Sequence, residues 1–594
     1  MHTHPQFTLE RIERVLRDRI APAVHAEIAP VSLAAWRVDG DGEPVPAAHA
    51  LGVDLLPGRS APEYEPFEVG STWGPAWSTT WFRVEGVIPA DAPGIVELTI
   101  DLGWEPHSVG GHGEALAYRP DGTPVKALHP QHGYLRLRGP GAAPDLVAED
   151  GSFVLYLEAA ANPLALGVPP FLVTDVGEKE TAKSFRPYEL RSAAISGFDP
   201  EMWDLVRDLE VAGGLVAELS AESTRYWRVL DAIGRCLDAF DDTDPATATA
   251  ARAELRSVLA APAHASAHQI SAVGHAHIDS AWLWPLRETR RKVARTVSNV
   301  LALMEEDPQF VYAMSSAQQF AWLEEDQPEL FARVVERVAE GRFLPVGGMW
   351  VESDAVMPTG ESMVRQFLRG MTYFADRFGL EPDGVWLPDS FGYSGALPQL
   401  ARRTGFRWFL TQKISWNDTN TFPHHSFHWE GIDGTRIFTH FPPAETYAAS
   451  VTQAELAHAE RTFRDKMRSS HSLLLFGYGD GGGGPTREML GRAHRSEDLE
   501  GSPAVTLRDP SAFFEMAESE YESTGGAPVW AGELYLELHR GTFTSQLAMK
   551  QGNRRSESLL RTVEHLWVLA TLRTGTAFPR EELTEIWEIG RAHV

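Results

Sequence analysis

The 594-residue chain is acidic and almost free of cysteine. Its 53 Lys and Arg residues face 82 Asp and Glu residues, and the net charge of −29 argues against nucleic acids and anionic membranes as partners. Cys236 is the single cysteine, which excludes an intramolecular disulfide. The sequence starts without a secretory leader and no apolar run approaches ~18 residues, so we expect a cytoplasmic protein without a membrane-spanning segment.

The first 266 residues predict a helix, a β-rich domain and a second helical region. Apolar residues near a 3.6-residue period predict a helix over residues 1–30. Short alternating runs between Pro- and Gly-rich turns predict a β-sandwich-like domain over residues 31–200. Residues 201–266 form a predicted helical linker region, which ends in an Ala-rich boundary segment.

From residue 267 onward, short apolar strands alternate with amphipathic helices. The clearest strands are expected at residues 270–273, 385–387, 408–410 and 473–476. Such alternation over residues 267–542 predicts a parallel sheet or a β/α barrel, whose binding site lies at the carboxyl ends of the strands. Residues 543–587 turn helical again and predict the start of a helical bundle. The expected fold class is therefore α/β plus β.

The motif GHAHIDSAWLW at residues 274–284 contains the first candidate site residues. His277 and Asp279 lie two residues apart directly after an expected strand, so their side chains project to one side of an extended segment. An imidazole and a carboxylate in that place form a natural ligand pair for a divalent metal. The alternative is a hydrogen-bonded histidine beside a turn aspartate. The position at a strand end, with two tryptophans nearby, favours the metal.

Two further acidic residues follow expected strands. Asp389, in WLPDSFGY at residues 386–393, can bind a metal or attack an electrophile, or it caps the next turn. Asp480 precedes four consecutive glycines, which either let the backbone approach a neighbour closely or form a flexible turn. On one face of a barrel, these carboxylates and a metal would converge beside tryptophan rings. That combination suits a sugar substrate.

Six motifs together resemble a known enzyme family. They are HIDSAW at 277–282, GGMWVESD at 347–354, RQFL at 365–368, WLPDSFGY at 386–393, TQKISWN at 411–417 and WEGIDG at 429–434. In sequence and order they are similar to the α-mannosidases of glycoside hydrolase family 38, in particular to the cytosolic and vacuolar branch. The resemblance covers roughly residues 40–585. It implies a seven-stranded parallel β/α-barrel catalytic domain, then a helical bundle, then large β domains.

The resemblance also implies a role for individual residues. His277, Asp279 and Asp389 match the ligands of one zinc ion, for which other divalent ions are alternatives. Asp389 also matches the nucleophile that forms a covalent mannosyl-enzyme, and Asp480 falls in the stretch that supplies the general acid/base. The implied substrate-binding side chains are Trp282, Trp416 and His539. The implied reaction is the retaining hydrolysis of terminal α-mannosides in a mannose-containing oligosaccharide, with further copies of the chain as partners in the full-length form.

The chain departs from the family near its end. The family's fourth zinc ligand is a histidine in a later helical segment, within a Phe-His-Asp run that this sequence lacks, and His539 does not lie at that position. Residues 588–594 are what a common sequencing-adapter string encodes, so we expect an artefactual tail on a chain truncated inside its helical bundle. We therefore expect weak or absent zinc binding and negligible activity. The alternatives are a catalytically silent carbohydrate-binding fragment and a zinc-dependent carbohydrate deacetylase that uses metal-bound water.

Overall fold

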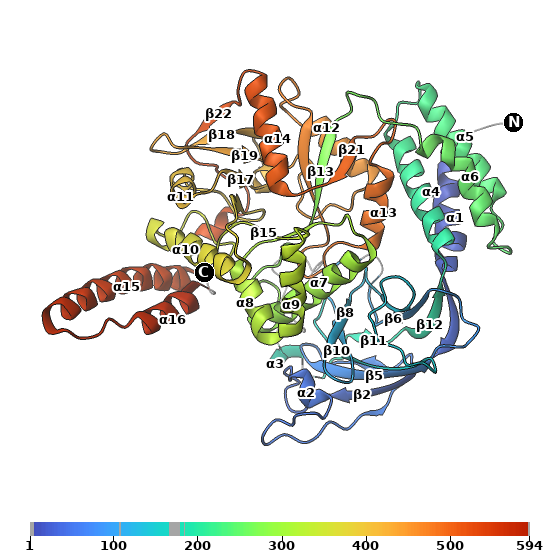
Figure 1. Cartoon of the computed structure of the whole chain (residues 1–594), viewed down its shortest axis with the longest axis horizontal. Helices are drawn as coiled ribbons and strands as arrows, with labels where there is room; N and C mark the ends of the chain where they lie inside the picture. Colours follow the sequence, from blue (N-terminus) through green and yellow to red (C-terminus); the bar gives the residue numbers. More distant parts are fainter. Residues whose placement is uncertain (1–4, 106–107, 165–178, 183, 592–594) are drawn as a thin grey trace.

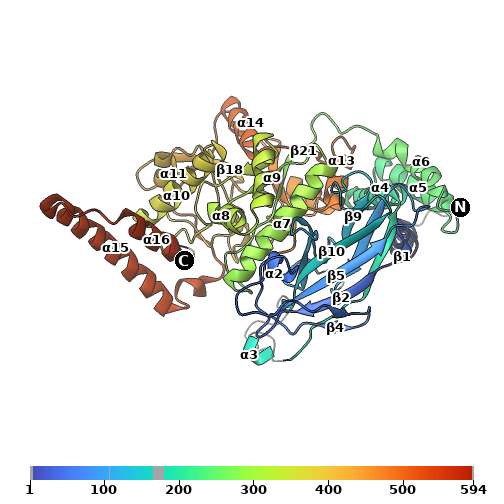
Figure 2. The same cartoon turned by 60° about the horizontal axis from the view of Figure 1, so that its bottom comes forward.

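The computed structural model describes residues 5–105, 108–164, 179–182 and 184–591. It contains a β-sandwich (residues 25–198), a helical region (α1 and α4–α6), a β/α domain (residues 269–531) and a C-terminal helical hairpin. The β-sandwich lies against one side of the β/α domain, and the hairpin projects away from the rest of the molecule (Figures 1 and 2). No helix in the described part of the chain is long and apolar enough to cross a membrane.

The β-sandwich consists of two antiparallel sheets. The first has the order β1-β12-β6-β9 and the second the order β3-β2-β5-β10-β7-β8. The strands of the first sheet are β1 (His25–Pro30), β12 (Ser192–Phe198), β6 (Val96–Asp101) and β9 (Tyr134–Arg138). Those of the second are β3 (Glu65–Pro66), β2 (Ser32–Arg37), β5 (Thr79–Val87), β10 (Ser152–Ala160), β7 (Glu114–Tyr118) and β8 (Pro124–Leu128). A short pair, β4 (Thr72–Trp73) and β11 (Tyr188–Glu189), lies beside them.

The six-stranded sheet is buried on both faces. Alternate side chains of a strand point to opposite faces, and in β7 this places Ala115 and Ala117 in the core between the two sheets. Leu116 and Tyr118 instead join the large apolar core that continues into the β/α domain. The β-sandwich is therefore packed face-on against the β/α domain, as Figure 2 shows.

The N-terminal helix is shorter than the sequence predicts. Helix α1 covers Pro5–Val15, short turns follow at Leu16–Ile20 and Ala21–Val24, and residues 25–30 form strand β1 rather than helix. Pro22, which lacks a backbone N–H, lies where the helix ends, and the chain then gains ladder hydrogen bonds from β12.

Helix α1 packs with three later helices into one apolar core. These are α4 (Pro200–Glu218), α5 (Thr224–Ala239) and α6 (Thr247–Leu259). Ile12 and Val15 of α1 share that core with Leu209, Ile233 and the buried Cys236. Helices α4–α6, which end at Leu259, thus form a compact unit with a core of their own, within the region 201–266 that the sequence predicts as a helical linker.

The β/α domain contains seven strands in the expected β/α order. They are β13 (Gln269–His275), β14 (Tyr312–Met314), β15 (Phe343–Pro345), β16 (Gly384–Trp386), β17 (Trp408–Leu410), β19 (Arg436–His440) and β20 (His471–Phe476). Hydrogen bonds join them in two parallel groups, β15-β14-β13-β20 and β16-β17-β19, rather than in one closed ring. The mixed α/β and β architecture confirms the expected fold class. The strands predicted at 270–273, 385–387, 408–410 and 473–476 all lie within or across observed strands.

Three additional strands and eight helices complete this domain. Strand β21 (Ala504–Leu507) pairs with β13, β18 (Ser426–Glu430) is antiparallel to β19, and β22 (Val529–Ala531) pairs with β18. The helices are α7 (Leu286–Glu306), α8 (Ala317–Asp326), α9 (Pro328–Ala339), α10 (Gly360–Phe378), α11 (Leu397–Thr404), α12 (Gln453–Thr462), α13 (Arg487–Arg495) and α14 (Pro510–Ser523). Helix α7 separates β13 from β14 and faces the β-sandwich (Figure 2).

The C-terminal hairpin consists of α15 (Leu547–Thr574) and α16 (Arg580–Arg591). Glu557 is the one buried side chain of α15, and its carboxylate accepts hydrogen bonds from the Thr359 amide at 2.9 Å and the Ser362 hydroxyl at 2.6 Å. Many apolar side chains of α15 are exposed, among them Leu559, Leu566 and Leu572. The expected artefactual tail at 588–594 begins within α16. Its last residues lie outside the described part of the chain, so that expectation stays a prediction.

We expect Glu557→Ala to release α15 from the start of α10. The substitution removes the acceptor of the Thr359 amide and the Ser362 hydroxyl, a loss of about 1–3 kcal/mol for a buried hydrogen-bonding group. Hydrogen exchange should therefore rise in α15 while the β-sandwich strands keep their protection. Exposed Glu585 of α16 provides the control, Glu585→Ala. Equal exchange of α15 in both variants would contradict this account.

Candidate active site

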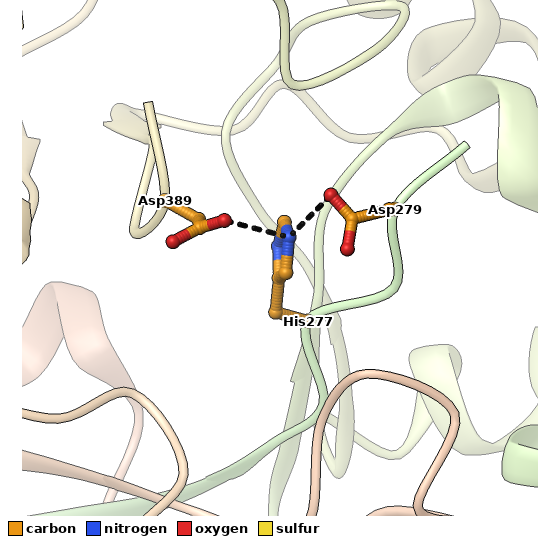
Figure 3. Close-up of side chains that lie close together, drawn as sticks. All are labelled: His277, Asp279 and Asp389. Carbon is orange, nitrogen blue, oxygen red and sulfur yellow. Dashed lines mark hydrogen bonds and ion pairs between the residues drawn. The ribbon is translucent and has the colours of Figure 1, made fainter. Parts of the chain in front are cut away.

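Three potential metal ligands meet at the carboxyl ends of two strands. His277 and Asp279 follow β13, and Asp389 follows β16, so the two parallel groups of strands converge at this point. The His277 Nε2 atom lies 3.3 Å from Asp279 Oδ1 and 3.5 Å from Asp389 Oδ2 (Figure 3). One donor atom from each residue lies within 4.8 Å of the others. The structure thus brings together the three residues that the sequence predicts as ligands.

A fourth carboxylate lies behind the histidine. Glu352 Oε2 is 2.9 Å from His277 Nδ1, and the Ser315 hydroxyl donates a hydrogen bond to the other carboxylate oxygen. Burial alone would lower the pKa of His277, but the negative charges of Glu352 and Asp279 raise it well above its ordinary value. Glu352 therefore orients the ring so that Nε2 faces the two aspartates. Carboxylate–histidine pairs of this kind are typical of metal sites.

A buried lysine balances the charge of Asp389. The Lys413 ammonium forms an ion pair with Asp389 Oδ1, and only 2% of this lysine side chain is exposed. The ammonium also lies 3.6 Å from the ring centroid of Trp416 and 5.0 Å from that of Phe391, where the ring faces attract a cation. Lys413 therefore fixes the orientation of the Asp389 carboxylate and ties it to an aromatic wall.

Asp480 lies at the tip of a tight turn after β20. Its backbone N–H donates to the His277 carbonyl at 2.7 Å, which joins the loops after β13 and β20. Burial is the main reason why the pKa of Asp480 is raised to about 6. The charges of Asp279 and Asp389 add to the increase, whereas His277 and Lys413 oppose it. A carboxyl group with this pKa can be protonated in weakly acidic solution and can act as a general acid.

A cavity of about 450 Å³ opens beside the three ligands. One wall consists of the ligands, Glu352 and residues 353–354, and the opposite wall belongs to α15 and the segment before it. The residues of this second wall are Thr542, Phe543, Ser545, Gln546, Met549, Lys550, Asn553 and Arg554. The volume suits one or two sugar rings, given that ligand pockets span roughly 300–1,000 Å³.

The three predicted substrate-binding side chains do not line this cavity. Trp282 is 49% exposed and contacts the ring of Trp284, and Trp416 is 38% exposed and covers Lys413. His539 is exposed, and its ring lies 5.4 Å from that of Phe391, a residue of the cavity wall. These aromatic side chains remain predictions for the outer part of the site.

Three residues of the site were not predicted from the sequence. Glu352 and Lys413 both lie in recognised motifs, GGMWVESD and TQKISWN, but Glu352 lies seven residues beyond its strand, and Lys413, three residues beyond β17, is a cation and not a metal ligand. Tyr447 is a third, since its ring lies 5.2 Å from that of His277. Membership of a motif was the one signal that could have pointed to Glu352 and Lys413.

We expect Glu352→Gln to weaken metal binding without loss of a ligand. An amide cannot stabilise the His277 N–H as a carboxylate does, and loss of such a partner costs roughly 10–100-fold in metal affinity. Calorimetric titration of the chain with zinc alone measures this affinity. Asp354→Asn is the matched control, because Asp354 lies two residues away and accepts hydrogen bonds from the amides of Val356 and Met357 instead. The same affinity in both variants would contradict the role given to Glu352.

Three family models match successive parts of the chain. Residues 29–196 match the jelly roll domain of α-mannosidase, and residues 267–533 match the N-terminal domain of glycosyl hydrolases family 38. Residues 537–590 match the α-mannosidase middle domain. The first match coincides with the β-sandwich, the second with the β/α domain and the third with the C-terminal hairpin.

Relatives with known names extend this match over most of the chain. Alpha-mannosidase 2C1 of Mus musculus is 39% identical over 562 residues, which is 93% of this chain and 52% of the relative. The Homo sapiens protein of that name is 38% identical over 99% of this chain and 54% of its own length. An alpha-mannosidase of Saccharomyces cerevisiae is 33% identical over 89% of this chain and 49% of its own length. The chain spans about half the length of these relatives. It belongs to glycoside hydrolase family 38.

Proposed function

We propose that this chain carries the catalytic residues of a zinc-dependent, retaining α-mannosidase. The observation that supports this most directly is the grouping of His277, Asp279 and Asp389 at the carboxyl ends of the strands, with Asp480 near enough for their charges to affect its pKa. The names of the relatives support the choice of substrate. Because the chain spans only about half of their length, the activity of the whole protein is part of the proposal.

The side chains that would hold the metal fit a zinc ion. Zinc in proteins binds imidazole nitrogen and carboxylate oxygen, and such donors come from His277, Asp279 and Asp389 within 4.8 Å of one another. When Nε2 of His277 binds a metal, the other ring nitrogen, Nδ1, needs a partner because the ring is buried. The Glu352 carboxylate, 2.9 Å from Nδ1, is that partner. A bound zinc ion would supply positive charge that attracts sugar hydroxyl groups. Its identity as zinc, rather than another divalent ion, belongs to the proposal.

Two carboxyl groups share the chemistry in this proposal. Retaining glycosidases use one carboxylate as nucleophile and a second carboxyl group as acid and then base. Asp389 attacks the anomeric carbon of the mannoside, and Asp480 donates its proton to the leaving oxygen as that bond breaks. In the second step Asp480 accepts a proton from water, and this water attacks the anomeric carbon and frees Asp389. Lys413 holds the Asp389 carboxylate in place throughout.

The outer part of the site and the cellular location complete the proposal. We propose that Trp282, Trp416 and His539 contact a mannose-containing oligosaccharide at the rim of the cavity. The exposure of both indole rings supports this, because an exposed aromatic face can stack on a sugar ring. A cytoplasmic location is supported by the resemblance to the cytosolic and vacuolar branch of the family.

A trapped intermediate would test the role of Asp389. We expect 5-fluoro-α-mannosyl fluoride to add one fluoromannosyl group to the protein, located by mass spectrometry on the peptide that contains Asp389. Trapping reports a single turnover, so it detects even weak activity. The Asp389→Asn variant should remain unmodified, and the Asp433→Asn variant, at an exposed aspartate outside the cavity wall, should be labelled like the parent. A protein that binds mannosides without any adduct would instead be a silent carbohydrate-binding protein.

The pH dependence would test the role of Asp480. Asp480 must be protonated to act as an acid, so the rate with an aryl α-mannoside should fall as the pH rises through about 6. Asp480→Asn should lose this limb and about 10²-fold or more in rate for a poor leaving group, the usual size of general-acid catalysis. For a 2,4-dinitrophenyl leaving group, which needs no proton, the loss in kcat/KM should be small, because kcat/KM reports the first step and not the second step, in which Asp480 acts as a base. Persistence of the limb in the variant would assign it to another group.

A further inference from the structure

The Asp480 turn is closed on itself and tied to the candidate metal site. The Tyr478 N–H donates to the Gly484 carbonyl at 3.0 Å, and the Gly484 N–H returns a bond to the Tyr478 carbonyl at 2.9 Å. Asp480 has φ of 53°, in the left-handed region, and its N–H bonds to the His277 carbonyl. The position of the Asp480 carboxyl group therefore depends on whatever holds the turn 478–484 in place.

The outer side of this turn packs so closely on the β-sandwich that the glycines at the contact leave no room for a side chain. A Cβ atom at Gly110 of the β-sandwich would lie 3.0 Å from the Asp480 carbonyl oxygen and 3.0 Å from the Gly482 nitrogen. A Cβ atom at Gly482 would lie 2.7 Å from the Val109 carbonyl oxygen. At Gly483 it would lie 2.8 Å from the ring of His129, also in the β-sandwich. The two backbones are therefore in direct contact.

Close approach, rather than unusual dihedral angles, explains two of these glycines. Gly481, Gly483 and Gly484 have positive φ values, but Gly482 and Gly110 do not. Backbone dihedral angles therefore do not require glycine at these two positions. A side chain at Gly110 would meet the backbone of the turn, and one at Gly482 would meet both the Tyr478 side chain of the same turn, at 2.6 Å, and the Val109 carbonyl oxygen. The glycine run that the sequence analysis left open as a flexible turn is thus a packed surface.

The inner side of the turn rests on a buried ionic cluster shared with the β-sandwich. The Lys292 ammonium of α7 lies 2.7 Å from where a Cβ of Gly481 would stand, and it forms an ion pair with Glu114 of β7. Arg295 of α7 lies 3.2 Å from the same carboxylate. Asn299, one turn further along α7, donates to the Gly483 carbonyl at 3.4 Å. Glu114 thus reaches across the domain boundary to the helix that supports the turn.

We propose that the β-sandwich positions the acid/base group of the β/α domain. The backbone at residues 109–110 contacts the outer side of the turn and limits its movement. Glu114 acts on the inner side, because it holds the Lys292 ammonium on which the turn packs. Gly110 and Glu114 are positioning residues, since neither touches the reacting atoms. The inference rests on the proposed role of Asp480. A displacement of about 1 Å in a reacting group can cost 10²-fold in rate, so this boundary would influence catalysis strongly.

A pair of glycine variants tests the outer contact. Gly110→Ala places a methyl group against the turn, whereas Gly94→Ala adds one where nothing lies within 4 Å, in the same domain and also without positive φ. We expect hydrogen exchange at the amides of Asp480, Gly482 and Gly484 to rise about 10-fold or more in Gly110→Ala, the equivalent of 1.4 kcal/mol, and to stay unchanged in Gly94→Ala. This readout needs neither substrate nor metal.

A pair of glutamate variants tests the inner contact. This pair also keeps the proposal testable if the Gly110→Ala protein does not fold. Glu114→Gln keeps the shape but loses the charge that holds Lys292. Glu158→Gln does the same to the ion pair with Arg291, whose carboxylate partners Glu158 and Glu288 belong to β10 and α7 rather than to the turn. The first should raise exchange in residues 478–484 and the second should not. The proposal would be overturned if hydrogen exchange in residues 478–484 were the same in Gly110→Ala as in Gly94→Ala, and the same in Glu114→Gln as in Glu158→Gln.

Activity then separates this inference from the proposed function. In Gly110→Ala, the rate for poor leaving groups should fall more than the rate for 2,4-dinitrophenyl mannoside, and zinc affinity should not change. Increased exchange with equal losses for all leaving groups would mean that the β-sandwich holds the turn but that Asp480 is not the acid, so the proposed role of Asp480 fails. Unchanged exchange would mean that the positioning inference fails, whatever the activity.

Discussion

The concentration of negative charge around one buried imidazole governs this site. Asp279, Glu352 and Asp389 all lie within 3.5 Å of the His277 ring nitrogens, and the ring is almost fully buried. Carboxylates this close repel one another unless cations separate them. The Lys413 ammonium supplies part of that compensation, and a divalent ion, which would replace the second proton of His277, would supply the rest. Burial is the main cause of the raised pKa of Asp480, and the charges of Asp279 and Asp389 add to it.

The sequence predicted what depends on strand ends and missed what depends on packing. His277, Asp279 and Asp389 were found because the carboxyl ends of parallel strands meet. Glu352 lies seven residues beyond β15, too far for the strand-end rule to indicate it. Lys413 lies as close to β17 as Asp389 lies to β16, but a lysine at a strand end does not predict a metal ligand. Lysine is almost always exposed, and the burial of Lys413 follows only from the tertiary contacts with Asp389 and Trp416. The end of the first helix was also missed, because pairing with β12 overrides helical periodicity there.

The six-stranded sheet of the β-sandwich has two apolar faces, and this explains why the β-sandwich packs against the β/α domain. One face of the six-stranded sheet packs against the other sheet, while the second face buries Leu116 and Tyr118 against the β/α domain. Charged residues on that second face, such as Glu114 and Glu158, are buried with cationic partners from α7. A buried charge is tolerated only with such a partner, so the two domains cannot separate without leaving unpaired charges.

The C-terminal hairpin is attached in a different way, and this has a consequence for ionic strength. Its contacts with α10 are polar: Glu557 binds Thr359 and Ser362, and Glu564 forms two 2.8 Å bonds to Arg365. Salt screens partly exposed ion pairs but strengthens apolar burial. Concentrated salt therefore loosens the wall of the cavity that α15 provides while it tightens the cores of the other domains. The width of the cavity is a property of the medium as well as of the fold.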